Sequence, residues 1–251
     1  MAALDTTLVI IAALTFLLAG FVKGMIGLGL PTVAVGLLGL AMPPAQAAAL
    51  LVVPSLVTNV WQLAVGPGFL ALVRRLWPML LCFCIGTWAG SACLSTGASR
   101  HASAMLGAAL VIYAALGLAA IRFQVPAGAE RWCSPLVGIL TGLIAVATGV
   151  FVIPAVPYLQ ALGLKKDELV QALGLSFTVS TVALASVLMA EGVFRLPVAG
   201  ASLLALVPAA AGMLAGQWVR ARVHAERFRV CFFIGLLLLG LHLFIRALGQ
   251  D

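Results

Sequence analysis

One lysine beside a run of glycines is the group in this chain best suited to binding a ligand. No other charged side chain lies within the apolar stretch Leu8–Leu40. Glycines let a helix bend and leave its amides uncovered, and the N-terminal end of the next helical piece carries partial positive charge. Free amides and an ammonium are groups that bind anions. The candidate residues are Lys23, Gly24, Gly27, Gly29 and Pro31.

Two interpretations of Lys23 are open at this point. In the middle of a bilayer its charge would cost about 2.5–3.5 kcal/mol, so it would need an acidic partner, water or an anionic ligand. Alternatively, its long side chain extends to the cytoplasmic interface and keeps the ammonium in water. The first interpretation predicts a ligand site, and the second predicts a membrane anchor.

A second glycine- and proline-rich break interrupts the apolar stretch Leu136–Leu164. Backbone without helical hydrogen bonds survives at membrane depth only where it faces protein or a wet cavity. Paired breaks in corresponding positions of two halves are the sequence feature that best indicates the binding site of a transporter. The candidate residues here are Thr148, Gly149 and Pro154.

Polar side chains follow each break. After the first, Ser55, Asn59 and Gln62 recur at i, i+4 and i+7 and share one helix face, with Thr58 beside them. After the second, the matching stretch contains polar residues of the same kinds. They could line a shared polar cavity between the halves or form ordinary hydrogen bonds between helices. The second-half residues are Gln171, Ser176, Ser180 and Thr181, of which Ser176 and Ser180 are taken as site candidates.

Composition places the chain in a membrane. It is 64% hydrophobic and 8% charged, whereas soluble domains carry about 25% charged residues. Apolar runs of about 20 residues recur from end to end, which predicts an all-α polytopic protein with about eight spans. The net charge of +7 comes from basic residues between these runs. This pattern is typical of cytoplasmic loops, so nucleic acid is not an expected partner.

The order of elements repeats. Gly20 corresponds to Gly142, Gly27 to Gly149 and Pro31 to Pro154, and each half carries a later Gly-x-x-x-Gly pair, Gly86/Gly90 and Gly212/Gly216. We therefore predict a first transmembrane repeat at residues 1–121, a cytoplasmic linker at 122–134 and a second repeat at 135–251. Each repeat is expected to contain a broken helical hairpin and three transmembrane helices. The glycine pairs indicate close helix packing, within the chain or in a homodimer.

Charge indicates that the repeats are inverted. If each broken stretch enters and leaves on the same side, ten basic residues fall on one side and three on the other, as the positive-inside rule expects. Both termini are then periplasmic. The first group is Arg74, Arg75, Arg122, Arg131, Lys165, Lys166, Arg220, Arg222, Arg227 and Arg229, and the second is Arg100, Arg195 and Arg246.

Groups for catalysis or metal binding are missing from the apolar stretches. The seven carboxylates all fall at chain ends or between the apolar runs. A nucleophile–base pair or a set of metal ligands at membrane depth is therefore not expected. We predict no enzyme activity, no catalytic residues, no metal site and no cofactor.

The duplicated pattern resembles the sulfite exporter TauE/SafE family. The matching parts are Gly24–Pro31, Leu37–Pro44 and Ala45–Gln62, and again Thr148–Pro154, Leu159–Asp167 and Leu169–Thr181. The resemblance implies a secondary transporter of small sulfur-containing or organic anions such as sulfite, sulfonate or carboxylate. Export is the expected direction. It also implies a bacterial inner membrane, so the expected partners are the lipid bilayer and a small anion. The alternative is a membrane subunit that assembles with other proteins and transports nothing.

Overall fold

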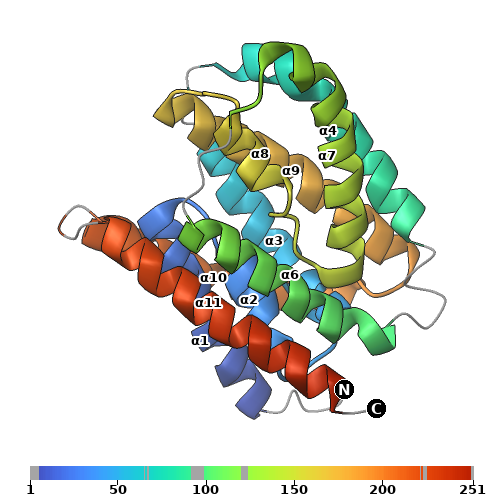
Figure 1. The fold of residues 1–251 in the computed structure, drawn as a ribbon. Coiled ribbons are helices and arrows are strands. Elements are labelled where there is room, and N and C mark those ends of the chain that lie inside the picture. The colour runs from blue at the N-terminus through green and yellow to red at the C-terminus, as the bar shows by residue number, and fades with distance from the viewer. Residues whose placement is uncertain are drawn as a thin grey trace.

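The computed structural model describes residues 6–64, 66, 68–91, 99–119, 124–220, 222 and 225–249. Over these residues the chain forms ten helices and no strand. Eight of the helices are long and apolar enough to cross a membrane. The protein is thus an all-helical, polytopic membrane protein, as the sequence predicts (Figure 1).

The first broken stretch consists of α1 (Thr6–Ile26) and α2 (Leu30–Leu38). Between them Gly27 and Gly29 have φ angles of 76° and 103°. Residues with a Cβ rarely adopt such angles, so glycine is required here. Pro31 lies in the first turn of α2, where its missing N–H leaves no acceptor unpaired. The predicted first break is confirmed.

The second broken stretch consists of α7 (Ala127–Thr148) and the short α8 (Ala155–Ala161). Gly149 ends α7 with a φ of 74°, and the Thr148 hydroxyl accepts a hydrogen bond from the Val150 amide at 3.1 Å. The second predicted break is also confirmed. Residues 127–134, expected to belong to a linker, are instead the first two turns of α7. Their polar residues suggested a loop, but polar residues are common where a helix begins.

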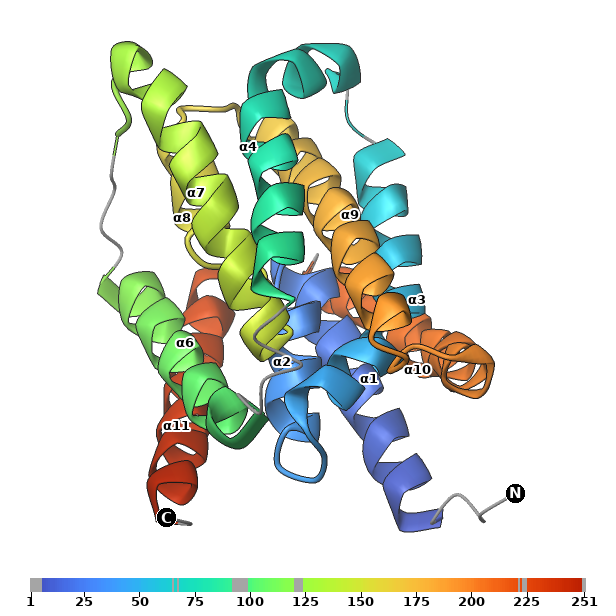
Figure 2. The ribbon, with the colours of Figure 1, turned by 90° about the vertical axis from the view of Figure 1, so that its right-hand side faces the viewer.

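Each short helix turns back toward the side from which its long helix came. The Val125 amide, just before α7, donates to the Ala161 carbonyl at the end of α8, at 3.0 Å. The Leu40 carbonyl, just after α2, accepts from Arg246 near the C-terminus, at 2.9 Å. Figure 2 shows α1 rising from the end of the molecule where both termini lie, and α7 descending from the opposite end.

Six longer helices complete the bundle. The two broken stretches are followed by α3 and α9, which contact each other, and α6 packs against α11. Arg122, one of the ten basic residues in the predicted cytoplasmic group, lies outside the described residues. The six helices are α3 (Pro44–Ala64), α4 (Phe69–Gly90), α6 (Ser99–Ala119), α9 (Lys166–Ala190), α10 (Leu196–Arg220) and α11 (Ala225–Leu248).

Glycines bring four of the helices into backbone contact in a crosswise arrangement. Helix α1 packs against α10, and α7 packs against α4. A Cβ at Gly20 would lie 2.0 Å from the Ala209 carbonyl oxygen, and one at Gly212 would lie 2.0 Å from that of Leu17. In the second pair, a Cβ at Gly142 would lie 2.4 Å from the Phe83 carbonyl oxygen. These glycines therefore serve packing within the chain.

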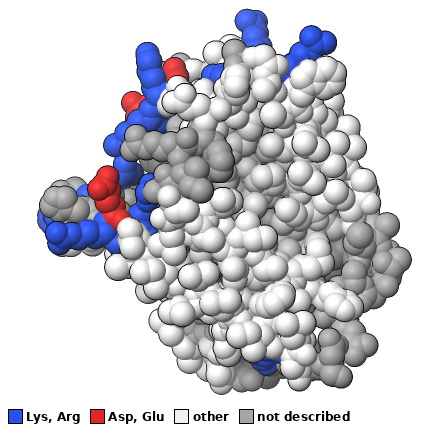
Figure 3. All heavy atoms as spheres, in the orientation of Figure 1, with Lys and Arg blue, Asp and Glu red and all other residues white. Residues whose placement is uncertain are grey.

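Burial divides the molecule into a covered centre and an apolar rim. Helix α2 and the second break are almost fully buried, whereas α10 exposes large apolar side chains such as Leu204 and Val207. Basic side chains gather at the end of the molecule opposite the termini, as Figure 3 shows for one face. They come from the starts of α4, α7, α9 and α11 and from the end of α10.

Candidate functional site

Lys23 is buried in the centre of the bundle, in the last turn of α1 before the first break. Its side chain is 5% exposed. The ammonium donates one hydrogen bond to the Thr58 hydroxyl at 3.0 Å and another to the Asn59 side-chain oxygen. Lys23 therefore does not extend to the interface, and the anchor interpretation does not describe this structure.

Helix α3 positions the partners of Lys23 on one face. Ser55, Thr58 and Asn59 are all at least 98% covered. The Thr58 hydroxyl donates to the Pro54 carbonyl at 2.7 Å, and the Asn59 amide donates to the Ser55 hydroxyl at 3.0 Å. Two of the three residues in the predicted stripe, Ser55 and Asn59, thus join Lys23, as expected for side chains one helical turn apart.

The same hydrogen-bond chain continues into α9. The hydroxyls of Ser55 and Thr181 are 3.0 Å apart, and Thr181 donates to the Phe177 carbonyl at 2.7 Å. Because Thr181 uses its proton on that carbonyl, Ser55 must be the donor of the pair. We call Lys23, Ser55, Thr58, Asn59 and Thr181 the Lys23 cluster.

The positive charge of Lys23 has no counter-charge in the cluster. The described residues form one salt bridge, between Arg75 and Glu130 at 2.7 Å, and it lies near the starts of α4 and α7. The acceptors around Lys23 are a hydroxyl and an amide oxygen, both neutral. A buried ammonium with only neutral partners favours an anion beside it.

The cluster also has donors to spare. An ammonium has three N–H groups and a side-chain amide has two. Lys23 uses two of its three, and Asn59 uses one of its two, on described residues. Space exists close by, since Gly27, one turn after Lys23, is partly exposed and a Cβ there would meet nothing within 4 Å.

The second break is separate from the Lys23 cluster in its contacts. Gly149 lies against α2 and α3, where a Cβ would be 2.9 Å from the Ala48 side chain and 3.2 Å from that of Val35. The amides of Phe151 and Val152, both buried, donate to no other described group. Buried amides of this kind cost free energy unless a ligand or water binds them.

Other predicted site residues have structural contacts instead. The Gln62 amide donates to the Val170 carbonyl at 2.9 Å, which ties α3 to α9. Gly24 packs against α10, where a Cβ would lie 2.2 Å from the Met213 carbonyl oxygen. Pro31 and Pro154 are at helix starts. Thr148 donates to the Ile144 carbonyl of α7 and accepts from the Val150 amide, and a Cβ at Gly29 would be 2.6 Å from the Val22 side chain.

Ser176 and Ser180 are both buried on α9. The Ser176 hydroxyl has no hydrogen-bond partner among the described residues. Neither serine bonds to a member of the Lys23 cluster, whereas Thr181 does. Thr58 was predicted to lie beside the first polar stripe, and Thr181 was one of the polar residues named in the second half. Thr58 follows Ser55 by three positions, a spacing that places both side chains on the same side of a helix.

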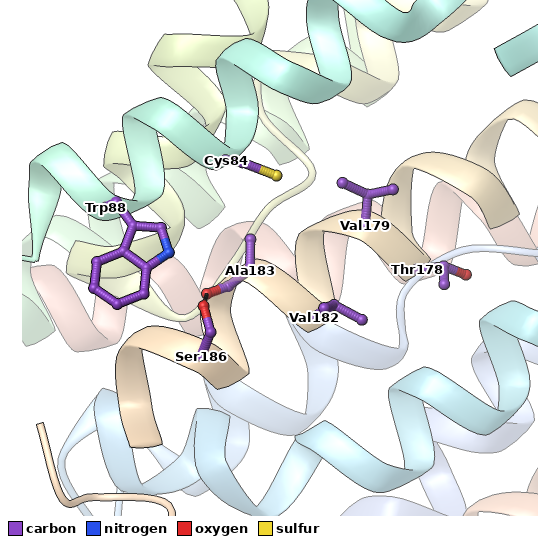
Figure 4. Close-up of a pocket in the computed structure, with 7 residues that line it drawn as sticks. All are labelled: Cys84, Trp88, Thr178, Val179, Val182, Ala183 and Ser186. Carbon is purple, nitrogen blue, oxygen red and sulfur yellow. Dashed lines mark hydrogen bonds between the residues drawn. The ribbon is translucent and has the colours of Figure 1, made fainter. Parts of the chain in front are cut away.

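A groove between α4 and α9 is a poor alternative site for an anion (Figure 4). It has a volume of about 320 Å³ and is lined by apolar residues such as Trp88 and Val182, both more than half exposed. Its two hydroxyls are occupied, because Thr178 donates to the Gly174 carbonyl and Ser186 to the Ala183 carbonyl, each at 2.7 Å. The groove thus offers an anion no free hydroxyl donor.

Comparison with known proteins identifies a matching family. The family model described as sulfite exporter TauE/SafE matches residues 12–243 of the chain, which include both helix breaks and the whole Lys23 cluster. No curated protein matches. No solved structure matches either.

Proposed function

The chain belongs to the sulfite exporter TauE/SafE family of membrane transporters, and from this premise we propose that it transports small sulfur-containing or organic anions. Sulfite, sulfonates and carboxylates are the candidate substrates, and export is the proposed direction. The proposed location is the bacterial inner membrane. The substrate binds at the Lys23 cluster, where donor groups stay unused.

One observation carries this proposal: a buried lysine with only neutral partners. Holding that charge at membrane depth costs about 2.5–3.5 kcal/mol on an insertion scale. No carboxylate lies within salt-bridge distance of Lys23 in the described residues. A bound anion offsets the cost, whereas a purely structural role would be served equally well by a neutral side chain.

We also propose that the two halves are inverted repeats that alternate access to the site. The support is the way in which the helices pair. Exchange of each helix for its counterpart turns the α1–α10 contact into α7–α4, and the α3–α10 contact into α9–α4, and all four contacts exist. The α3–α9 and α6–α11 contacts map onto themselves. The substrate site would then lie where the halves meet, as in other transporters built from repeats.

The proposed orientation places both termini in the periplasm. The basic residues gather at the other end of the molecule, which the positive-inside rule assigns to the cytoplasm. A C-terminal fusion to alkaline phosphatase, which is active only outside the cytoplasm, tests this orientation. We expect an active phosphatase, and an inactive one together with an active cytoplasmic reporter would reverse the assignment.

The transport proposal is tested with purified protein in liposomes. We expect efflux of a radiolabelled sulfonate or of sulfite from loaded vesicles, and at least a tenfold slower rate for Lys23→Gln, because a hydrogen bond to a charged group contributes about 1.5–3 kcal/mol. Lys166→Gln is the matched control, since Lys166 is exposed at the start of α9. If wild-type vesicles move no anion tested, the chain is a non-transporting subunit and the proposal is wrong.

A further inference from the structure

We infer that the Lys23 cluster selects singly charged oxyanions and rejects doubly charged ones. The inference rests on the proposed function and concerns the charge of the substrate at that same site. The observations that carry it are the number of charges and the number of unused donors around Lys23.

The charge count comes from the positions of the ionisable residues. Lys23 is the one charged side chain in the described interior of the bundle, because the described carboxylates and the other cations lie near helix ends or in connections. A ligand with one negative charge makes the site neutral. A ligand with two leaves one negative charge buried without a partner, and such a charge is strongly unfavourable in a low-dielectric interior.

The donor count limits the ligand in the same direction. The hydroxyl protons of the cluster are committed, since Thr58 donates to Pro54, Ser55 to Thr181, and Thr181 to Phe177. One N–H of Lys23 and one N–H of Asn59 stay available. Two N–H groups match two oxygens of a single sulfonate, hydrogen sulfite or carboxylate group, and they leave a second anionic group of the same ligand without donors.

Asn59 provides a way to alter the charge while keeping the shape of the site. Asn59→Asp replaces the amide by a carboxylate of nearly the same size, next to the ammonium that its oxygen already contacts. The resulting ion pair cancels the charge of Lys23 and keeps the contact between α1 and α3. The variant should therefore fold and should lose its affinity for anions.

The experiment compares ligands whose charge does not depend on pH near neutrality. Propane-1-sulfonate carries one charge, and ethane-1,2-disulfonate has a similar length and carries two. Their dissociation constants for the purified wild-type protein are measured by thermal stabilisation and by competition with efflux of labelled methanesulfonate from liposomes. We expect the disulfonate to bind at least tenfold more weakly. Lys23→Gln and Asn59→Asp should each weaken binding of the monosulfonate at least tenfold, and Lys166→Gln should leave it unchanged.

The outcomes separate this inference from the transport proposal. If the disulfonate binds within tenfold of the monosulfonate while Lys23→Gln weakens both, transport at this site stands and the charge selection is refuted. Wild-type affinity in Asn59→Asp also refutes it. If neither sulfonate binds, and neither sulfite nor a carboxylate is transported, the proposed function itself fails.

Discussion

Ser202 on α10 forms hydrogen bonds with the backbone of α3 next to Pro54, a proline inside that helix. Pro54 has no N–H, so the Leu50 carbonyl one turn earlier in α3 lacks its helical donor. The Ser202 hydroxyl donates to that carbonyl at 2.8 Å and accepts from the Val53 amide at 3.0 Å. One fully buried hydroxyl therefore replaces the missing donor to the Leu50 carbonyl and also bonds α10 to α3 through the Val53 amide.

We predict that Ser202→Ala destabilises the protein by about 2 kcal/mol. The change leaves the Leu50 carbonyl without the donor that replaces the proline N–H and removes an acceptor of the Val53 amide, and a buried polar group that loses its partner costs about 1–3 kcal/mol in soluble proteins. Hydrogen bonds between membrane helices average about 0.6 kcal/mol with a maximum of about 1.7, so two of them together support a value near 2. Unfolding in mixed micelles by sodium dodecyl sulfate, followed by tryptophan fluorescence, measures the difference.

A second substitution tests whether Ser202 compensates for Pro54. Pro54→Ala returns an N–H to α3. This N–H can donate to the Leu50 carbonyl and replace one of the two hydrogen bonds of Ser202. Ser202→Ala should therefore cost about 1 kcal/mol less in the Pro54→Ala background, a coupling that a double-mutant cycle detects. Ser91→Ala, whose hydroxyl bonds at an exposed position, should cost less than about 0.5 kcal/mol. Strict additivity of Ser202→Ala and Pro54→Ala would refute the account.

Further predictions concern helix packing and the side-chain amide of Gln171, which joins α9 to the end of α3. On α10, Gly212→Ala should destabilise by about 1–3 kcal/mol, because the new Cβ would lie 2.0 Å from the Leu17 carbonyl oxygen. Gly200→Ala on the same helix meets nothing within 4 Å and should stabilise by about 0.4–1 kcal/mol; equal melting temperatures for the two variants would contradict the packing. Gln171→Leu removes an amide that bonds three backbone groups at the α3–α4 connection and should cost about 2–3 kcal/mol. Gln160→Leu is its control, because Gln160 is exposed. A similar loss of stability in both variants would show that the hydrogen bonds of Gln171 do not stabilise the protein.

The helix breaks could be predicted from sequence because their cause is local. Glycine adopts positive φ at little cost, as Gly27 and Gly149 do, and clustered glycines followed by a proline weaken a helix at that point. The stripe of Ser55 and Asn59 was likewise visible, since helical periodicity alone places them together. These features depend on residues within a few positions of one another.

Partner choice across the chain could not be predicted in this way. Ser55 meets Thr181, which is 126 positions away, and many buried hydroxyls could have filled that place. Gln62 lies on the same face as Asn59 but bonds to a carbonyl of α9, because a long amide reaches whichever backbone group is nearest. Glycine spacing predicted close packing, but the residues around Gly20 do not indicate that Ala209 would be its neighbour.

The crosswise pairing of α1 with α10 has a consequence for how the protein is made. The glycine face of α1 enters the bilayer early in synthesis, yet the backbone it contacts belongs to residues near 209–216. Until the ribosome has delivered that late segment, the glycine face of α1 lacks the α10 backbone that it contacts in the finished protein. We therefore expect neither half to fold when it is expressed alone, and we expect the two halves to assemble when they are produced together, because each then supplies the helix that the other lacks.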